Sequence, residues 1–246
     1  EGATTRRESV LRNGTNEVAT WTLDAAGLTV DWRLLQMPVA GPLHDYMYSR
    51  QGAQYIVEDL LYQHDFVAPE QVVGKVLTGY KVLFMPRILA MSDAEVDAVK
   101  AFLANGGKVI ADELPGDYDE LGVRREANPF AGVEGVTVTG ANFDDQNDAQ
   151  RSDMLAALEA AGATKALASP TIVAHRGREA MHYVSGDAHV YAVIRHPNRS
   201  SDTDAETFVF NATGHVYDVR TGAYLGRGDR VTAAVPCSEA SVFAIL

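Results

Sequence analysis

The chain has 246 residues, of which 46% are hydrophobic and 22% charged, and its formal net charge is −12 at pH 7. That length can bury a sizeable core, and we expect one larger domain accompanied by a small one. The composition is ordinary for a globular protein, which excludes an intrinsically disordered chain. Nucleic-acid binding normally requires a basic face, and no apolar run approaches the roughly 20 residues of a membrane span. We therefore expect neither a nucleic-acid nor a membrane partner.

Cysteine usage and the first residues bear on the compartment. Cys237 is the only cysteine in the sequence, which excludes an intrachain disulfide and a cysteine-based zinc site. The sequence starts at Glu1 and shows no basic, apolar and small-residue pattern of a signal peptide. These features favour a soluble, cytoplasmic protein.

The N-terminal part of the chain is expected to be β-rich and then helical. Residues 1–30 combine polar and β-prone residues without a helical period, which predicts a leading strand or two and a linker. The run RLLQMP at 33–38 predicts a buried strand. Residues 49–65 show helical spacing with Ser49 as the expected N-cap, and the apolar positions are Ala53, Ile56, Val57, Leu60 and Leu61.

Strands and helices alternate in the next part of the chain. Short apolar runs predict three strands, at 65–69, 80–86 and 108–112. Residues 92–107 predict a helix that Ser92 and Glu95 open with a capping box and that Gly106 or Gly107 ends. Its buried stripe comprises Val96, Val99, Phe102 and Leu103. Because these strands are apolar rather than alternating, we expect a mostly parallel sheet with helices on both faces.

The remainder of the chain changes from helical to β character. A strand is expected within 133–140, and a helix over 148–162 with one face formed by Met154, Leu155, Leu158 and Ala161. From about Ala174 the helical period vanishes, and seven short β-prone runs follow, at 180–186, 188–196, 206–214, 214–220, 223–227, 230–236 and 240–246. This pattern predicts a small antiparallel sandwich or barrel, and we favour the sandwich.

Motifs for cofactors and nucleophiles are missing. The sequence has no G-x-G-x-x-G, so no dinucleotide cofactor is expected. Residues 105–109 (NGGKV) resemble a phosphate loop, but position 101 is alanine and the glycine pair ends a helix. The segments after the strands at 80–86 and 108–112 have no serine or cysteine between glycines, as a nucleophile elbow requires.

The histidines do not form a recognisable metal motif. His175, His182 and His189 are seven residues apart, an odd spacing that would alternate their faces on strands. Neither H-x-x-x-H nor H-x-H occurs in the sequence. We therefore expect no metal site.

The stretch KVIADELPGDYDELG at 108–122 holds the best candidates for chemistry. Five carboxylates follow a buried strand, at Asp112, Glu113, Asp117, Asp119 and Glu120. A carboxylate pair could act as acid and base in glycoside hydrolysis, and such groups could also bind Ca²⁺ or Mg²⁺. The Pro-Gly turn inside the stretch favours a solvated loop instead. The candidates that we keep for catalysis are Asp112, Glu113 and Asp117, with His44 as a partner.

Two stretches resemble one family. The succession YKVLFMPRILAMSDAEVDAVKAFLANGGKVIADELPGDYDELG at 80–122 resembles the trimerisation domain of β-galactosidases, a non-catalytic relative of class I glutamine amidotransferases. The run GHVYDVRTGAYLGRGDRV at 214–231, with SVFAIL at 241–246, resembles the small β domain that follows it in such glycoside hydrolases. The resemblance covers roughly Leu34 to Leu246.

The resemblance implies a fold and a role. It implies a flavodoxin-like amidotransferase-like domain over 31–173 after a leading segment at 1–30, and a C-terminal β domain over 174–246. The nucleophile is expected to be lost, because Asp112 or Glu113 stands in its place. In the family the catalytic carboxylates lie in a separate (β/α)₈ barrel, which needs about 250 residues of its own and is not present in this sequence.

Three hypotheses follow for the function. The first is a non-catalytic oligomerisation module of a carbohydrate-active, β-galactosidase-like protein, whose partners are copies of itself or a catalytic barrel domain. The second is a hydrolase in its own right, which uses the carboxylates at the strand ends. The third is a carbohydrate-binding module in which Trp21, Trp32, Tyr46 and Tyr48 would stack on sugars. We expect this chain alone to be non-catalytic.

Overall fold

A computed structural model describes the backbone of residues 4–11, 17–25, 28–36, 43–140, 143, 148–169, 177–196, 205–237 and 239–246, and side chains from residue 47 onward within these ranges. The chain forms two compact units. Unit 1 comprises residues 1–51 and 68–145, and unit 2 comprises residues 52–67 and 146–246. The division therefore falls within a helix and not between consecutive domains. Among the described residues, no helix is both long and apolar enough to cross a membrane.

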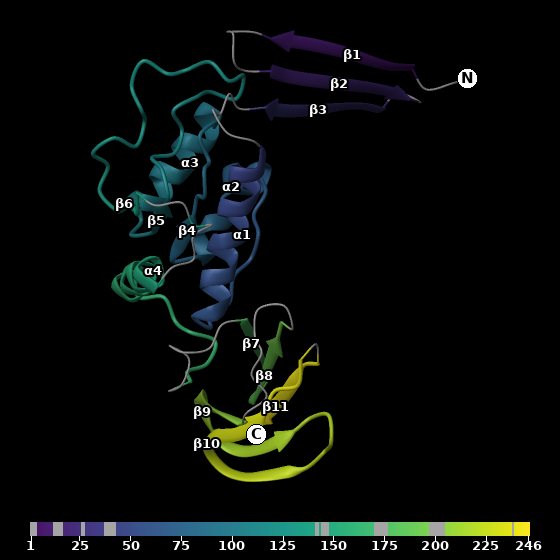
Figure 1. The fold of residues 1–246 in the computed structure, drawn as a ribbon, viewed down its shortest axis with the longest axis vertical. Helices are drawn as coiled ribbons and strands as arrows, with labels where there is room; N and C mark the ends of the chain where they lie inside the picture. The colour runs from purple at the N-terminus through teal and green to yellow at the C-terminus, as the bar shows by residue number, and fades with distance from the viewer. Residues whose placement is uncertain are drawn as a thin grey trace. The chain divides into compact units, whose positions relative to one another are not determined.

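The first part of unit 1 is a three-stranded antiparallel sheet (Figure 1). Its strands are β1 (Thr4–Leu11), β2 (Glu17–Ala25) and β3 (Leu28–Gln36). The expected strand at 33–38 overlaps β3, which pairs with β2 in this sheet and not with the parallel strands. The short connection between β2 and β3 explains the difference, because parallel neighbours need a long crossover.

Helix α1 (Leu43–Asp59) begins earlier than the sequence predicts. Ser49 is therefore not the N-cap but lies inside the helix, where its side chain is fully buried. The strand expected at 65–69 is also wrong. Its last residue, Pro69, opens the short helix α2 (Pro69–Val73), where its missing N–H group costs no hydrogen bond.

A parallel three-stranded sheet in the order β4-β5-β6 confirms the expected α/β character of unit 1. Ser92 and Glu95 form the predicted capping box at the start of α3, and the predicted apolar stripe of α3 is buried. Helix α2 packs against α3, and α3 contacts β5. The elements are the 3₁₀ helix η1 (Val76–Gly79), β4 (Val82–Phe84), α3 (Asp93–Ala104), β5 (Lys108–Ala111) and β6 (Val136–Val138).

The two glycines between α3 and β5 have different roles. Gly106 has a φ of +90°, a left-handed conformation that ends the helix without side-chain strain. A Cβ atom at Gly107 would lie 2.3 Å from the ring of Phe102, so only glycine lets this ring pack over the backbone. The resemblance of this glycine pair to a phosphate loop thus has a structural cause.

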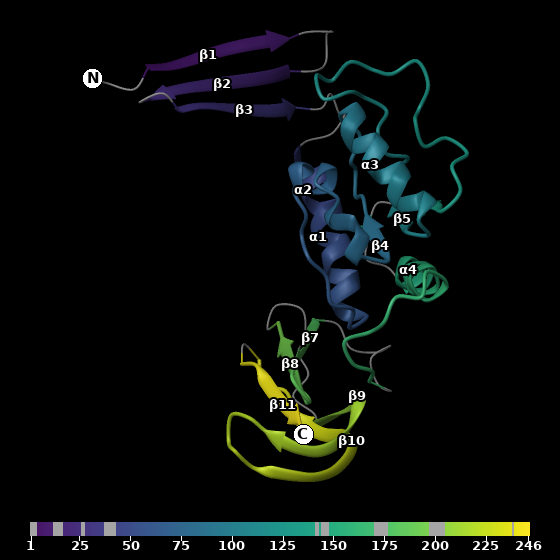
Figure 2. The same cartoon turned by 180° about the vertical axis from the view of Figure 1, so that it is seen from behind.

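Unit 2 contains the second half of α1, helix α4 (Asp148–Ala160) and a five-stranded antiparallel sheet in the order β10-β9-β11-β8-β7 (Figure 2). The strands are β7 (Arg178–Ser185), β8 (Ala188–Arg195), β9 (Ala205–Asp218), β10 (Tyr224–Ala234) and β11 (Ser241–Ile245). The expected α4 and antiparallel β region are confirmed. In the described part of the chain, however, these strands form one sheet and not the two of a sandwich.

Five strands replace the seven predicted runs, because two pairs of runs merge. Gly214 suggested a break, yet it lies inside β9, where the backbone of Leu246 comes close. A Cβ atom at Gly214 would lie 2.4 Å from the carbonyl oxygen of Leu246. The backbone N–H of His215 donates to the same oxygen at 2.9 Å. The glycine therefore marks a close backbone approach and not a turn.

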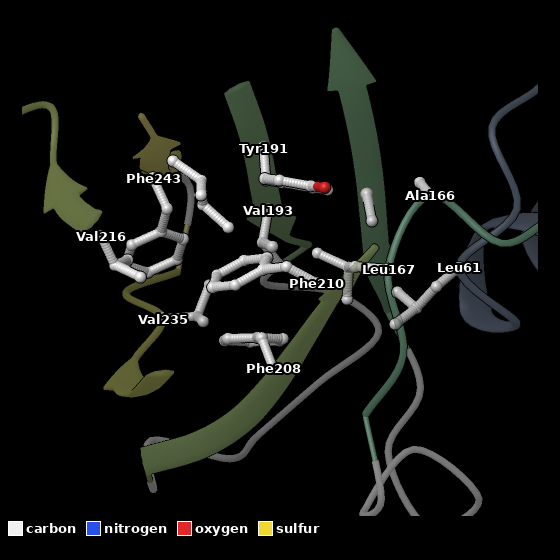
Figure 3. Packing of buried hydrophobic residues seen from close by; sticks show 12 residues of the cluster. Leu61, Ala166, Leu167, Tyr191, Val193, Phe208, Phe210, Val216, Val235 and Phe243 are labelled. Carbon is white, nitrogen blue, oxygen red and sulfur yellow. The ribbon is translucent and has the colours of Figure 1, made fainter. Parts of the chain in front are cut away.

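One face of this sheet carries the core of unit 2 (Figure 3). Aromatic rings from three strands meet there, with the ring centroids of Tyr191 and Phe210 4.6 Å apart and those of Phe210 and Phe243 5.8 Å apart. Leu61, just after α1, and Leu167, after α4, pack into the same cluster. A backbone hydrogen bond of 2.9 Å from Ala166 N–H to the carbonyl of Leu61 joins these two segments. The end of α1 is thus an integral part of unit 2.

Candidate functional site

The acidic stretch begins where β5 ends, at the position where an α/β sheet usually presents its chemistry. Asp112 is the first residue after β5, and only 2% of its surface is exposed. A buried carboxylate is stable only when hydrogen bonds or a cation replace the water that it loses. The partners of Asp112 therefore decide what it can do.

Both oxygens of Asp112 accept hydrogen bonds within unit 1. Oδ1 accepts from the backbone N–H of Arg87 at 2.7 Å and from that of Glu113 at 3.0 Å. Oδ2 accepts from the hydroxyl of Ser49, which comes from α1. One carboxylate therefore ties α1 to the segments that follow β4 and β5. This is the geometry of a structural anchor.

Arg87 holds the turn that follows β4. Its φ of +47° is left-handed, which costs a non-glycine residue about 1–2 kcal/mol. The hydrogen bond from its N–H to Asp112 helps to hold that conformation. Its guanidinium lies 3.1 Å from the carboxylate of Glu113, whose side chain is 47% exposed. Glu113 therefore forms a surface ion pair and does not point inward with Asp112.

The rest of the acidic stretch is an ordered loop. Asp117 Oδ1 accepts from the side-chain amide of Asn128 at 2.7 Å, and the same amide donates to the carbonyl of Pro115 at 2.9 Å. Asp119 Oδ1 accepts from the backbone N–H groups of Leu121 and Val123 at 2.9 and 2.8 Å. These carboxylates close turns, which agrees with the predicted loop.

The catalytic candidates thus make separate contacts. Asp112 faces Ser49, Glu113 faces Arg87 and Asp117 faces Asn128. Within the described side chains, this loop contains no group of three potential metal ligands. His44 belongs to the first turn of α1, but its side chain lies outside the described residues.

The aromatic candidates for sugar stacking are only partly described. Trp21 and Trp32 lie opposite each other in the register of β2 and β3, and their side chains lie outside the described residues, as does that of Tyr46. Tyr48 is 39% exposed on α1. The described side chains therefore do not show an aromatic platform for sugar stacking.

A second group of polar side chains, which the sequence did not reveal, lies in unit 2. It comprises Glu58 near the end of α1, Glu179 on β7 and His196 just after β8. One ligand atom of each lies within 4.8 Å of the others, so the three could hold a metal ion. The residues are far apart in the sequence and match no spacing motif.

Two other histidines stack on the sheet of unit 2. The rings of His182 and His189 are 5.2 Å apart, and His182 Nε2 lies 3.0 Å from His189 Nδ1. The expectation that the spacing of seven would separate them is wrong, because the turn between β7 and β8 brings them to one face. Burial, followed by the neighbouring charge of His189, lowers the pKa of His182 below 6.5.

Comparison with known proteins yields structural neighbours only. No family model matches the chain. No curated protein matches it by sequence. Among solved structures, a β-galactosidase from Bacillus circulans sp. alkalophilus matches with a TM-score of 0.62 and 14% identity, over 86% of this chain and 39% of the neighbour. The described fold is therefore similar to part of a much longer protein.

Two further structures give the same result. The exo-carrageenase GH42 from Bacteroides ovatus matches with a TM-score of 0.51 and 14% identity, over 78% of this chain and 26% of its own. A catalytic mutant of Gan42B, a GH42 β-galactosidase from G. stearothermophilus, matches with a TM-score of 0.56 and 10% identity, over 80% and 36%. At these identities the likeness concerns the fold, and this chain spans well under half of each neighbour.

Proposed function

We propose that this chain is a non-catalytic structural module of a carbohydrate-active, β-galactosidase-like protein. In this role it would support assembly with copies of itself or with a catalytic barrel domain, and it would help to wall a sugar-binding cleft. We also propose that residues 31–173 form a flavodoxin-like domain related to the glutamine amidotransferases. The α/β and β regions described above are compatible with such a module.

The observation that carries the proposal is the environment of Asp112. A catalytic acid, base or nucleophile needs an oxygen that can reach a substrate. Both oxygens of Asp112 are instead engaged by Ser49 and by two backbone N–H groups, and only 2% of the residue is exposed. Asp112 follows β5, where an α/β enzyme often has its reactive groups, and its contacts instead connect α1 to the segments after β4 and β5.

The structural neighbours support the carbohydrate connection. The neighbours described above are GH42 enzymes or a β-galactosidase by name, and this chain matches 26% to 39% of their lengths. The remaining length of such proteins leaves ample room for a barrel of about 250 residues. A supporting role beside a catalytic domain is consistent with these proportions.

An exposed apolar pair offers a place to test assembly. The turn closed by Asp119 presents Leu121 and Val123, which are 55% and 61% exposed. Apolar side chains that gather on a surface are typical of interaction sites. They belong to the loop that also carries the candidate catalytic carboxylates, so the same loop can be tested for both roles.

Sedimentation velocity of the 246-residue chain tests the proposed assembly. We expect a concentration-dependent oligomer, and we expect Leu121→Asp combined with Val123→Asp to weaken its association at least about tenfold. Val184→Asp is the matched control, because Val184 is 60% exposed in unit 2. A chain that stays monomeric at high concentration would contradict the assembly role.

A further inference from the structure

The Glu58, Glu179 and His196 cluster lies outside the proposed module function and carries an inference of its own. Glu58 is 2% exposed, and its Oε1 accepts from the amide of Gln54 at 2.7 Å. Its other oxygen, Oε2, lies 3.9 Å from Nε2 of His196. An oxygen of Glu179 lies 3.5 Å from the same nitrogen. Two carboxylates thus converge on one imidazole nitrogen.

Among the described residues, that nitrogen makes no hydrogen bond. Nε2 of His196 has almost no exposed surface and no hydrogen-bond partner among the described residues. A buried polar atom without a partner is costly, and a bound ion can offset that cost by coordinating the atom. The backbone of His196 is well fixed, because its N–H donates to the carbonyl of Gly177 at 2.9 Å. The imidazole is therefore placed by the strand that precedes it.

The electrostatic environment favours a cation. Glu58 and Asp59 are the last two residues of α1, where the negative end of the helix dipole disfavours carboxylates. Asp59 accepts from Gly177 N–H at 2.6 Å and pairs with Arg151 at 3.2 Å, and Glu58 accepts from the amide of Gln54. Glu58 and Glu179 both face His196, which is charged only when protonated. With a neutral imidazole, the cluster carries two negative charges.

The imidazole nitrogen lies within 4 Å of both carboxylates, and all three ligand atoms lie within 4.8 Å of one another. In a tetrahedral zinc site with bonds of about 2.0 to 2.1 Å, the ligand atoms lie about 3.3 Å apart. The observed distances of 3.5 and 3.9 Å to the imidazole nitrogen need only a small contraction. Glu179 and His196 are 24% and 37% exposed, so their side chains have room to adjust.

The ligand types select the class of ion. Imidazole is a ligand for zinc and other transition metals, whereas Ca²⁺ and Mg²⁺ prefer sets made only of oxygen ligands. Two carboxylates and one imidazole leave a fourth position that water can occupy, as in zinc sites with three protein ligands. Such an ion would connect α1 to β7 and to the end of β8 within unit 2.

We propose that Glu58, Glu179 and His196 bind a divalent transition-metal ion of the zinc type, which fastens the end of α1 to the β7–β8 hairpin. The competing possibility is a proton on His196, which would pair with both carboxylates and leave no place for an ion. The two alternatives differ in a direct observable. Only the metal site takes up Zn²⁺ at a stoichiometry of one ion per chain.

The test is a titration of the chelator-treated 246-residue chain with Zn²⁺, followed by calorimetry, and with Co²⁺, followed by its visible absorption. We expect one ion per chain and a higher thermal midpoint with Zn²⁺, and little effect of Ca²⁺. His196→Gln and Glu179→Gln, on partly exposed side chains, should each weaken Zn²⁺ binding at least about tenfold. Glu58→Gln should do the same if it folds.

Two matched controls separate this site from other zinc ligands. Glu134→Gln removes the same charge from an exposed loop, and His189→Gln removes an imidazole from the His182 pair. Both variants should bind Zn²⁺ as the unmodified chain does. A chain that binds no Zn²⁺ stoichiometrically would overturn the proposal. So would binding that survives in His196→Gln or that disappears in His189→Gln.

Discussion

Asp112 in unit 1 and Glu58 in unit 2 are both buried carboxylates, each 2% exposed, yet their surroundings differ. Asp112 receives three hydrogen bonds from a hydroxyl and two backbone N–H groups, all from the protein itself. Glu58 directs one oxygen toward an imidazole nitrogen that has no hydrogen bond among the described residues, with a second carboxylate nearby. The first is held by donors of the protein, whereas the second belongs to a group of three side chains that could hold a metal ion.

The difference shows that position in the fold does not fix the role of a carboxylate. Asp112 stands at the end of a parallel strand, where active sites are usually built, and is structural by its contacts. Glu58 stands near the end of α1 and belongs to a group of three potential metal ligands with Glu179 and His196. What matters is which donors the neighbouring segments direct at the oxygens.

Glu206 is a third buried carboxylate, and its removal should cause the largest loss of stability among these predictions. It pairs with Arg178 inside unit 2, where Arg178 Nε donates to Glu206 Oε1 at 2.7 Å and both residues are buried. Glu206→Ala removes the carboxylate from a buried guanidinium, which we expect to cost about 3 to 5 kcal/mol of unfolding free energy. Urea unfolding of Glu206→Ala and of the unmodified chain measures this loss of unfolding free energy. A loss below about 1 kcal/mol would mean that Arg178 does not depend on Glu206.

Asp112→Ala should destabilise the chain by about 3 kcal/mol, because Ser49 and two backbone N–H groups lose their acceptor. Glu113→Ala, at the next position, removes only a half-exposed ion pair with Arg87 and should cost below about 1 kcal/mol. Denaturant unfolding of both variants provides the comparison. Equal losses would contradict the anchoring role of Asp112.

Added Zn²⁺ should raise the unfolding free energy through the Glu58 cluster and not through Asp112. At a free Zn²⁺ concentration of about 100 times its dissociation constant, the unmodified chain should gain about 2.7 kcal/mol. His196→Gln should gain little, while Asp112→Ala, although weaker overall, should keep the full increment because its substitution lies in unit 1. Thermal unfolding with and without Zn²⁺ measures the increments. A Zn²⁺-dependent gain in stability that disappears in Asp112→Ala but persists in His196→Gln would contradict the placement of the metal site in unit 2.

The smallest expected effect is on the pH dependence of stability, and it comes from His182 in its pair with His189. The pKa of His182 is lowered by burial and then by His189, so the unfolded chain binds its proton more tightly than the folded one. Its contribution is complete above pH 6.5 and is lost as the pH falls from 6.5 toward the lowered pKa. The stability of His182→Gln should therefore fall less steeply with acidification than that of the unmodified chain. Thermal midpoints across this range test it, with His64→Gln as the control.

The sequence predicted the elements whose signals are local. The capping box of Ser92 and Glu95, the apolar stripe of α3 and the glycines after it are short-range patterns, and all are confirmed. The ordered loop after β5 also followed from its Pro-Gly turn. Local signals failed where a distant segment decides the outcome. Ser49 has the local context of a cap, whereas its burial against Asp112 is a contact between remote residues.

The same reason accounts for the other errors. The predicted runs at 206–214 and 214–220 divide at Gly214, but this glycine lies inside β9, where the close approach of Leu246 requires it. The odd spacing of His182 and His189 indicates opposite faces only if both lie on one strand, and a turn separates them. The Glu58, Glu179 and His196 cluster unites a helix and two strands, so no spacing rule could find it. The chemistry of the residues could be read from the sequence, whereas contacts between residues that are far apart in the chain could not.

The most direct test of the account is hydrolysis of a chromogenic aryl β-galactoside by the purified 246-residue chain. If the carboxylates after β5 are structural, the rate equals that of buffer and does not change in Glu113→Gln or Asp117→Asn. Both substitutions alter partly exposed side chains and should leave the fold intact. Turnover above buffer that disappears in either variant, with an unchanged thermal midpoint, would contradict the claim that this chain is a non-catalytic module.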